Sequence, residues 1–264
     1  MRPVPALITC PLAALVLLVP LSIGAQTRPL NDTGITWSGH ATSGNVTTCA
    51  ASHPAGQDCH YGRDKAAADG ALTKTGHSAP DVEAHGIPNG FDYTKISNSG
   101  AALPPSATLG TGPNDWACTR DNVTGLIWEV KTTSGLRGQS HTYTWFNTLS
   151  PYGNSGTASG GSCETTGRCD TEKYVQDVNL AGLCGANDWR MPTVKELEGI
   201  ADMGRFSPAI DPVFFPNTPS SGVWSGSPLA GNPNDAWVVN FSYGNAYFVN
   251  RSGGSHVRLV RGGQ

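Results

Sequence analysis

The sequence is poor in charged residues and carries none of the motifs of the common enzyme classes. Charged residues make up 14% of the 264 residues, against ~25% in an average protein. The formal net charge of -3 argues against nucleic-acid binding as a property of the whole chain. Neither a Gly-x-Ser-x-Gly nucleophile elbow nor a phosphate-binding P-loop occurs, and nothing points to a pair of catalytic carboxylates. We therefore expect a protein that is not an enzyme and needs no cofactor.

The longest apolar run lies at the start of the chain and is interrupted by prolines. It covers residues 6–23, follows a single basic residue and ends in small residues at Gly24 and Ala25. This layout predicts a secretory signal peptide over residues 1–25, cleaved near Ala25, rather than a membrane anchor. No later run is long and apolar enough to span a bilayer. We expect a mature protein without a transmembrane span that is secreted, periplasmic or on the cell surface.

Six cysteines follow the predicted signal peptide, and an even number in an exported chain predicts three disulfides. They are Cys49, Cys59, Cys118, Cys163, Cys169 and Cys184. Their spacings are wider than the Cys-x-x-Cys pairs of a metal site, so disulfides are favoured over metal ligation. Closure of the shortest loops suggests Cys49–Cys59 and Cys163–Cys169, which leaves Cys118–Cys184, although the spacing leaves the other pairings open.

Composition divides the mature chain near Pro113. Residues 26–112 are rich in Gly, Ala, Ser and Thr and have few large apolar side chains, and residues 101–113 have the composition of a linker. We expect short strands there and a helix of at most two turns over residues 62–70. Because this region can bury little core alone, we expect it to pack against the denser region of residues 113–264.

Two short helices are predicted by their capping residues. Asp170 or Thr171 can cap a helix that continues through Ala181. Thr193 and Glu196 have the spacing of a capping box, in which each side chain accepts a hydrogen bond from the other residue's backbone N–H.

Strand patterns surround these helices. Residues 118–130 have the composition of a buried strand. Residues 237–243, 246–251 and 256–261 are expected strands, and turn residues separate them, which predicts an antiparallel β-meander. Two short helices beside a meander, stapled by disulfides and preceded by a Gly/Ser-rich extension, define an α+β fold.

Three blocks of sequence together resemble one protein family. They cover residues 119–131, residues 188–197, and residues 224–227 with 257–261. In this order and spacing they resemble the Lcl C-terminal domain family, named for a collagen-like bacterial adhesin, over roughly residues 115–262. The resemblance implies a C-type-lectin-like fold, a secreted or surface location and, in some members, adhesion to sulfated glycans.

The same blocks are distantly similar to formylglycine-generating enzymes. That enzyme class needs a pair of C-terminal cysteines for its oxygen chemistry, and this chain has no cysteine after Cys184. The resemblance therefore favours a binding scaffold over a catalyst. Asp188, Trp189 and Arg190 directly precede a capped helix, so we interpret them as structural, with Trp189 in the core and Arg190 bound to carbonyl groups or to an acid of the meander.

A small basic cluster is the first candidate binding site. Arg251, His256 and Arg258 lie on neighbouring expected strands and could meet an anionic group such as a sulfate. The alternative is salt-bridged packing or a solvated face.

The loop between Trp224 and the meander is the second candidate. Sugars stack on Trp faces, and Asn234 and Asp235 are polar loop residues beside it. Their oxygen atoms also suit Ca²⁺, but the sequence Asn-Pro-Asn-Asp is an ordinary turn former, so we favour a turn and assign no metal. We expect a surface protein that binds a glycan, in particular a sulfated polysaccharide, or another surface protein. The alternative is a structural or docking subunit of an extracellular appendage or envelope complex.

Overall fold

The protein is built mainly from strands, with a few short helices and three disulfides, which confirms the mixed α+β class. The computed structural model describes residues 30–74, apart from 41, 43, 47, 48 and 50–55, together with residues 90–150 and 154–262. The predicted signal peptide over residues 1–25 lies outside the described residues. None of the described helices combines the length and apolarity needed to cross a bilayer.

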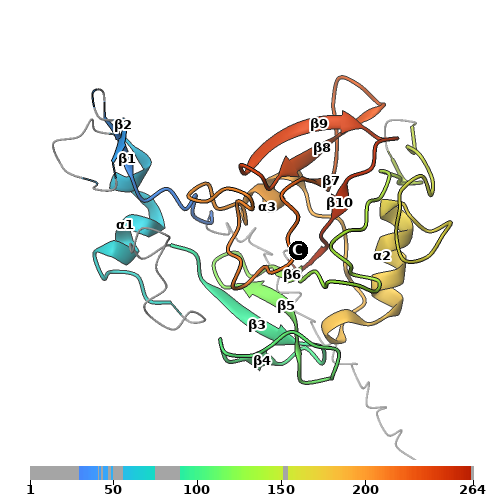
Figure 1. Ribbon diagram of the computed structural model, residues 1–264, viewed down its shortest axis with the longest axis horizontal. Helices are drawn as coiled ribbons and strands as arrows, with labels where there is room; N and C mark the ends of the chain where they lie inside the picture. Colours follow the sequence, from blue (N-terminus) through green and yellow to red (C-terminus); the bar gives the residue numbers. More distant parts are fainter. Residues whose placement is uncertain are drawn as a thin grey trace, which may run out of the picture.

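Two sheets form the body of the molecule, one above the other in the view of Figure 1. The four-stranded sheet has the order β10-β7-β8-β9, and the five-stranded sheet has the order β11-β6-β5-β3-β4. The first sheet contains β7 (Gly222–Pro228), β8 (Asp235–Asn240), β9 (Asn245–Asn250) and β10 (His256–Val257). The second contains β3 (Tyr93–Ser97), β4 (Ala102–Leu103), β5 (Trp116–Asp121), β6 (Ile127–Glu129) and β11 (Val260–Arg261).

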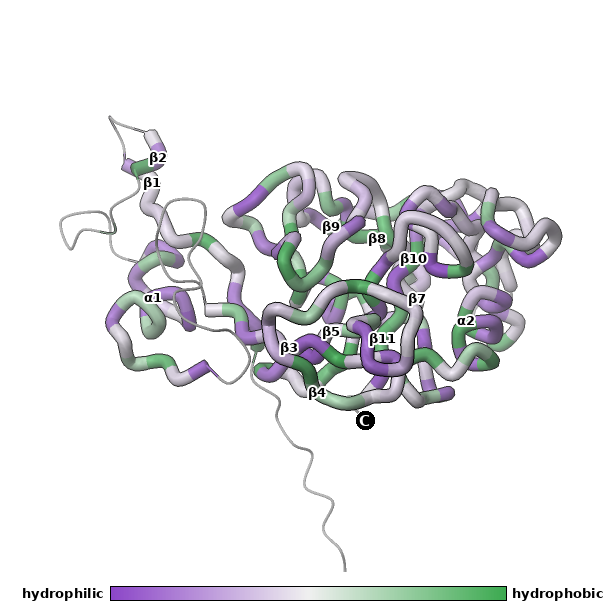
Figure 2. The backbone as a smooth tube through the Cα atoms, turned by 60° about the horizontal axis from the view of Figure 1, so that its bottom comes forward, coloured by the Kyte–Doolittle hydropathy of each residue, from purple (hydrophilic) through white to green (hydrophobic). Residues whose placement is uncertain are grey.

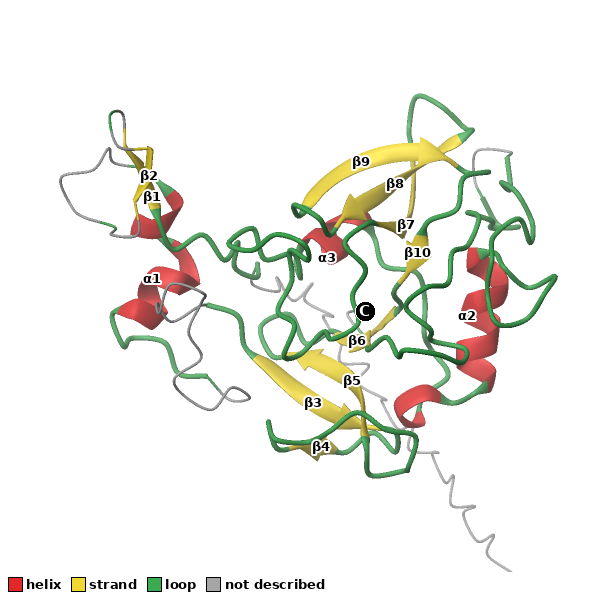
Figure 3. Ribbon diagram, in the orientation of Figure 1, coloured by secondary structure: helices red, strands yellow, loops and turns green. Residues whose placement is uncertain are grey.

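The two predicted helices are present with their caps. α2 (Thr171–Leu180) flanks the body (Figure 3) and begins at Asp170, whose side chain accepts a hydrogen bond from the Lys173 backbone N–H. α3 (Val194–Glu198) begins at Thr193, and both hydrogen bonds of its capping box are formed. A 3₁₀ turn, η2 (Leu183–Gly185), follows α2.

Hydrophobic residues lie on both faces of the four-stranded sheet. Trp224 and Val238 belong to a cluster shared with α2, whereas Val223 and Val239 belong to a second cluster shared with α3. Because neighbouring residues of a strand point to opposite faces, the central strands must be apolar at successive positions. Figure 2 shows the resulting contrast between hydrophobic stretches within the body and hydrophilic residues on the exposed side of α2.

The last strand corrects the expected meander. β8 and β9 form the predicted hairpin, with Asp235 opposite Asn250. Residues 256–261, however, do not continue it. β10 pairs in parallel with β7, on the far side of the sheet from β9, and β11 then pairs antiparallel with β6. The C-terminal segment therefore joins the two sheets, a long-range arrangement that alternation alone does not encode.

Two further expectations are corrected by the five-stranded sheet. Residues 118–130 form a hairpin of β5 and β6 rather than one strand, because residues 122–126 make the turn between them. β3 pairs with β5, and β4, inside the expected linker, pairs with β3. This sheet thus crosses the boundary expected near Pro113.

The N-terminal region forms a small unit at the side of the body (Figure 1). It contains β1 (Ser38–His40), β2 (Gly44–Val46), a 3₁₀ turn η1 (Asp58–His60) and α1 (Gly62–Ala68), which is the predicted two-turn helix. Asn31 donates to Asp121 at 2.9 Å, and the Met203 backbone N–H donates to Thr33 at 2.7 Å. The expected packing of this region against the rest of the chain is therefore observed.

The disulfides have the suggested connectivity. Cys49 is bonded to Cys59, Cys163 to Cys169, and Cys118 to Cys184. The first two close short loops, whereas the third joins β5 to the turn after α2.

Candidate functional site

An open cleft of about 580 Å³ lies between α2, the segment 145–149 and the residues that precede α3. Its volume lies in the range of ~300–1,000 Å³ that is typical of small-ligand sites. Most of its wall is apolar and is formed by Trp145, Phe146, Leu149, Val175 and Met191. Leu149 is 87% exposed and lies at the rim.

A few polar groups line the same cleft. One carboxylate oxygen of Glu172 accepts hydrogen bonds from the backbone N–H and the hydroxyl of Thr148, at 2.6 and 2.9 Å. Its other oxygen has no hydrogen bond within the part of the chain that the structure describes. The amides of Asn147 and Gln176 also line the wall. The cleft thus offers an acceptor and two amides beside an apolar surface.

The positively charged side chain that lines the cleft, Arg190, is already paired with an acid. Arg190 binds both carboxylate oxygens of Glu196, at 2.8 and 2.7 Å. Burial alone would raise the pKa of Glu196, but the hydrogen bonds from Arg190 and from the Thr193 backbone hold it below its ordinary value. Glu196, which Arg190 binds, also belongs to the capping box of α3. Arg190 is therefore a structural residue of the cleft wall.

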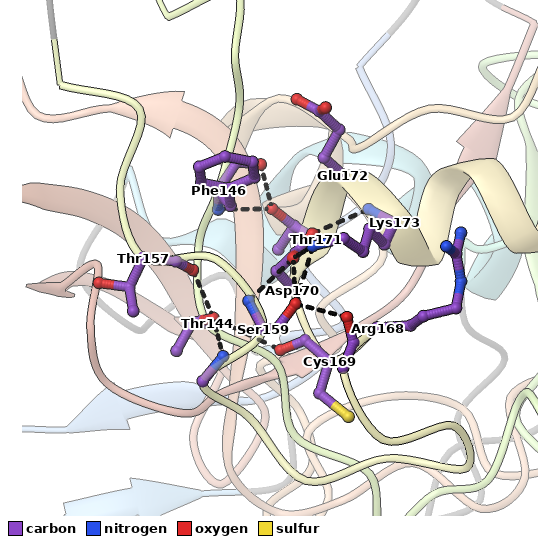
Figure 4. A network of polar contacts seen from close by, with 12 residues as sticks. Thr144, Phe146, Thr157, Ser159, Arg168, Cys169, Asp170, Thr171, Glu172 and Lys173 are labelled. Carbon is purple, nitrogen blue, oxygen red and sulfur yellow. Dashed lines mark hydrogen bonds and ion pairs between the residues drawn. The ribbon is translucent and has the colours of Figure 1, made fainter.

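A buried carboxylate organises the end of α2 that faces the cleft (Figure 4). Asp170 is fully buried and accepts hydrogen bonds from the backbone N–H groups of Ser159 and Lys173, both at 2.9 Å. Its second oxygen also forms an ion pair with the Lys173 ammonium at 2.7 Å. Asp170 therefore fixes the start of α2 and the adjoining loop together.

The neighbouring Thr171 fixes the aromatic wall. Its hydroxyl accepts a hydrogen bond from the Phe146 backbone N–H at 2.9 Å and donates to the Phe146 carbonyl at 2.8 Å. Figure 4 shows both bonds between α2 and the segment beside it. The backbone that carries Phe146 is thereby held against the first turn of α2, so this wall is formed before any ligand arrives.

The indole of Trp145 is held from two sides. Its Nε1 donates to the Ser225 carbonyl at 2.9 Å. The guanidinium carbon of Arg251 lies 4.1 Å from the centroid of the ring, which is close enough for a cation–π contact. Trp145 is thus a fixed, largely buried part of the wall.

The prediction of a basic cluster that could bind an anion is wrong, because its two arginines are interior residues. Arg251 and Arg258 are each 1% exposed. Arg258 donates to the Glu129 carbonyl and, at 2.7 Å, to Thr218, and burial lowers its pKa to about 10. Arg251 donates to the carbonyls of Asp235 and Asn154. Both guanidinium groups hold the interior together instead of facing a ligand.

The other members of the predicted site are also occupied by internal contacts. Trp224 is fully buried, and its Nε1 donates to the Tyr143 carbonyl at 2.7 Å, so its face is not offered to a sugar. His256 contacts the His141 carbonyl through Nδ1 at 2.8 Å, and burial lowers its pKa. None of the six predicted residues lines the cleft, although Arg251 contacts its Trp145.

The loop before β8 has the geometry of a turn. The Asn232 amide donates to Asp235 at 2.8 Å, and the Asn234 backbone N–H donates to Asn232 at 3.0 Å. Asn154 donates to the Asn234 side chain at 2.8 Å. These side chains therefore satisfy one another, as in an Asx turn. Among the described residues, the one close group of three potential metal ligands is Cys49, Cys59 and His60, and its two sulfurs form a disulfide.

The structural interpretation of residues 188–190 is correct in its main point. Trp189 is 2% exposed and donates to the Leu183 carbonyl at 2.9 Å. Arg190 donates to the carbonyls of Met191 and Gly262, as one alternative predicted. It is also bound by an acid, but that acid is Glu196 of α3 rather than a residue of the meander.

Sequence reasoning missed the cleft, although two of its signals are visible. The aromatic pair Trp145-Phe146 indicates an unusual local surface, and Glu172 and Gln176 lie four residues apart on one face of a capped helix. What the sequence cannot indicate is that these two segments lie side by side.

Comparison with known proteins identifies the body of the molecule. The family model of the Lcl C-terminal domain matches residues 117–261, which is more than half of the chain. No curated protein and no solved structure matches the chain. The family match and the three disulfides fit a surface or secreted protein.

Proposed function

The chain belongs to the Lcl C-terminal domain family, and from this premise we propose that it is a non-enzymatic surface or secreted protein that binds a neutral glycan in the cleft beside α2. The observation that carries the proposal is the composition of this cleft, where a fixed aromatic and apolar wall adjoins the free oxygen of Glu172. The lectin-like fold and export by a signal peptide belong to the same proposal, supported by the family resemblance and the disulfides.

The chemistry of a sugar suits this wall. The C–H face of a sugar ring is apolar and can lie against Phe146 and Leu149, while its hydroxyl groups can donate to Glu172 and bond the amides of Asn147 and Gln176. Recognition of a sulfate would instead need a cation that is free to bind it. Because Arg190 is committed to Glu196, a neutral glycan is favoured over a sulfated one.

The same lining supports binding without turnover. Hydrolysis of a glycosidic bond commonly uses two carboxyl groups on either side of that bond. Among the described residues that line the cleft, Glu172 carries the one carboxylate. We therefore propose recognition rather than cleavage.

The proposal is tested with a matched pair of exposed leucines. Leu149 is 87% exposed and lines the cleft, whereas Leu180, at the other end of α2, is 89% exposed and does not line it. A glycan array with neutral and sulfated members would identify a ligand, and calorimetry would measure its affinity. We expect Leu149→Glu to weaken binding by about tenfold or more, or ~1.4 kcal/mol, and Leu180→Glu to leave it unchanged.

Salt provides a second criterion. Binding through stacking and neutral hydroxyl groups should change little between low and high ionic strength, because no ion pair is screened. Binding restricted to sulfated glycans, equal losses in both leucine variants, or release of sugar products from the array ligand would each contradict the proposal.

A further inference from the structure

The free edge of β9 differs from the other edges of the two main sheets. Within the described residues these sheets end in β10 and β9, and in β11 and β4. Three of these edge strands contain two residues each, whereas β9 contains six. Short edge strands limit unwanted pairing between proteins, so β9 is the edge that stays open to a further strand.

β9 also lacks the devices that usually protect an edge. Its sequence, Asn-Ala-Tyr-Phe-Val-Asn, contains no charged residue and no proline. Its register with β8 is continuous, without a bulge, from Asn245 to Asn250. Charges, prolines and bulges are the features that normally prevent edge-to-edge association.

The hydrogen-bond pattern determines which groups of β9 face outward. The Arg251 backbone N–H donates to the Asn234 carbonyl, on the β8 side. Because the bonded direction alternates along an antiparallel pair, Tyr247 and Val249 also bond β8. The backbone groups of Ala246 and Phe248 therefore point away from the sheet, and no strand within the described residues pairs with them.

We propose that two copies of this chain associate through their β9 strands, antiparallel and around a two-fold axis that passes beside Phe248. Outward-facing residues can bond only with outward-facing residues, so the allowed registers pair residues 246, 248 and 250 with one another. The symmetric register places Phe248 opposite Phe248 of the second copy and Ala246 opposite its Asn250. The Asn250 carbonyl already accepts the Gly253 backbone N–H at 2.8 Å, so the Phe248 pair and the Asn250 N–H supply the new backbone hydrogen bonds. The four-stranded sheet then continues across both copies.

The aromatic side chains favour this register. Phe248 is 53% exposed and lies edge-to-face against Trp237 of β8, with 6.0 Å between the ring centroids. In the symmetric register two such pairs meet and form one row of four aromatic rings across the axis. A shifted register would set each Phe248 against Ala246 or Asn250 and bury less aromatic surface. β9 carries no charge, so the association places no like charges opposite each other.

The test measures the mass of the purified chain in solution, with an exposed phenylalanine elsewhere as the control. Phe206 is 76% exposed and lies outside the strands. Sedimentation equilibrium should show a dimer for the unaltered protein and for Phe206→Lys. Phe248→Lys and Ala246→Lys should each weaken dimerisation by about tenfold or more, with circular dichroism verifying that both variants are folded.

A cysteine at the axis tests the register directly. The Cα atoms of a hydrogen-bonded antiparallel pair are ~5.5 Å apart, which lies within the range that a disulfide spans. Phe248→Cys should therefore form a covalent dimer under mild oxidation, whereas Phe206→Cys should not. A monomer at all concentrations, a trimer, an oligomer unaffected by Phe248→Lys, or pairing of β9 with a strand of a different protein would overturn the proposal.

Discussion

The guanidinium carbon of Arg251 lies over the indole ring of Trp145, 4.1 Å from its centroid, and both side chains are almost completely buried. This contact joins the residue after β9 to the wall of the candidate cleft. A residue that the sequence suggested as a surface anion ligand therefore has a different task, which is to hold an aromatic ring in place.

Truncation of Arg251 should destabilise the whole protein. Arg251→Ala removes the donor to the carbonyls of Asp235 and Asn154 and leaves a cavity beside Trp145, so we expect a loss of about 2–4 kcal/mol. Lys195→Ala, at a side chain 86% exposed, is the control and should cost less than about 0.5 kcal/mol. Urea denaturation measures both, and equal midpoints would show that the buried arginine adds no stability.

The buried pair of Glu129 and Lys131 should be costly to break from one side. Glu129 accepts from Lys131 at 2.8 Å and from Tyr174, and both members of the pair are at most 3% exposed. Glu129→Gln leaves the ammonium group without its counter-charge, so we expect a loss of about 3–5 kcal/mol. The double variant Glu129→Gln/Lys131→Met should recover most of it. Equal denaturation midpoints for the single and double variants would refute this account.

Stability should fall in two steps on acidification. Burial lowers the pKa of His256 below its ordinary value of 6.5, so the unfolded state binds a proton first as the pH falls below about 6.5. Burial alone would raise the pKa of Glu129, but Lys131 and the hydrogen bonds hold it below 4.5. The stability that ionised Glu129 contributes is present above about pH 4.5 and is lost as the pH falls through the lower pKa of Glu129 in the folded state.

The two steps can be separated by substitution. The free energy of unfolding measured from pH 8 down to pH 3 should lose its first decrease in His256→Gln and keep the second. A profile that is flat between about pH 7 and 5.5 in the unaltered protein would show that His256 does not contribute.

The disulfides should contribute different amounts to the free energy of unfolding, according to the length of the loop that each one closes. Cys118–Cys184 spans 66 residues and Cys163–Cys169 spans 6. In the chain-entropy description, replacing the first pair by alanine costs about 4 kcal/mol and replacing the second about 2 kcal/mol. Thermal unfolding of the two double variants measures the order, and a greater loss for the shorter loop would contradict the entropic explanation.

The cap of α2 should matter for stability and for binding together. Asp170→Ala removes the acceptor for the Lys173 and Ser159 backbone N–H groups, at a cost of about 1–2 kcal/mol. Because Asp170 fixes the first turn of α2 and the neighbouring Thr171 holds the Phe146 backbone, affinity for a cleft ligand should fall as well. Glu198→Ala, in α3 and away from the cleft, serves as the control in calorimetry. An unchanged affinity in the Asp170 variant would show that the cap of α2 does not contribute to ligand binding.

The sequence was most informative where the determining interactions are local. Thr193 and Glu196 lie three residues apart and satisfy each other, so the spacing alone predicts their helix. The short loops of Cys49–Cys59 and Cys163–Cys169 gave the correct disulfides, and the third followed from them. The family assignment was confirmed by the match of the family model to residues 117–261.

Other features were decided by contacts between distant parts of the chain. The alternation in residues 256–261 indicates strands but not their partners, and the structure pairs them with β7 and β6 instead of β9. The residues next to an arginine in the sequence also do not show whether its side chain faces water or a buried indole. Arg251 and Arg258 became interior residues because carbonyl and aromatic groups from far along the chain surround them. Sequence thus determined caps, loop closures and family, since these depend on residues a few positions apart. Tertiary structure decided burial, strand order and the cleft, since these depend on which segments meet.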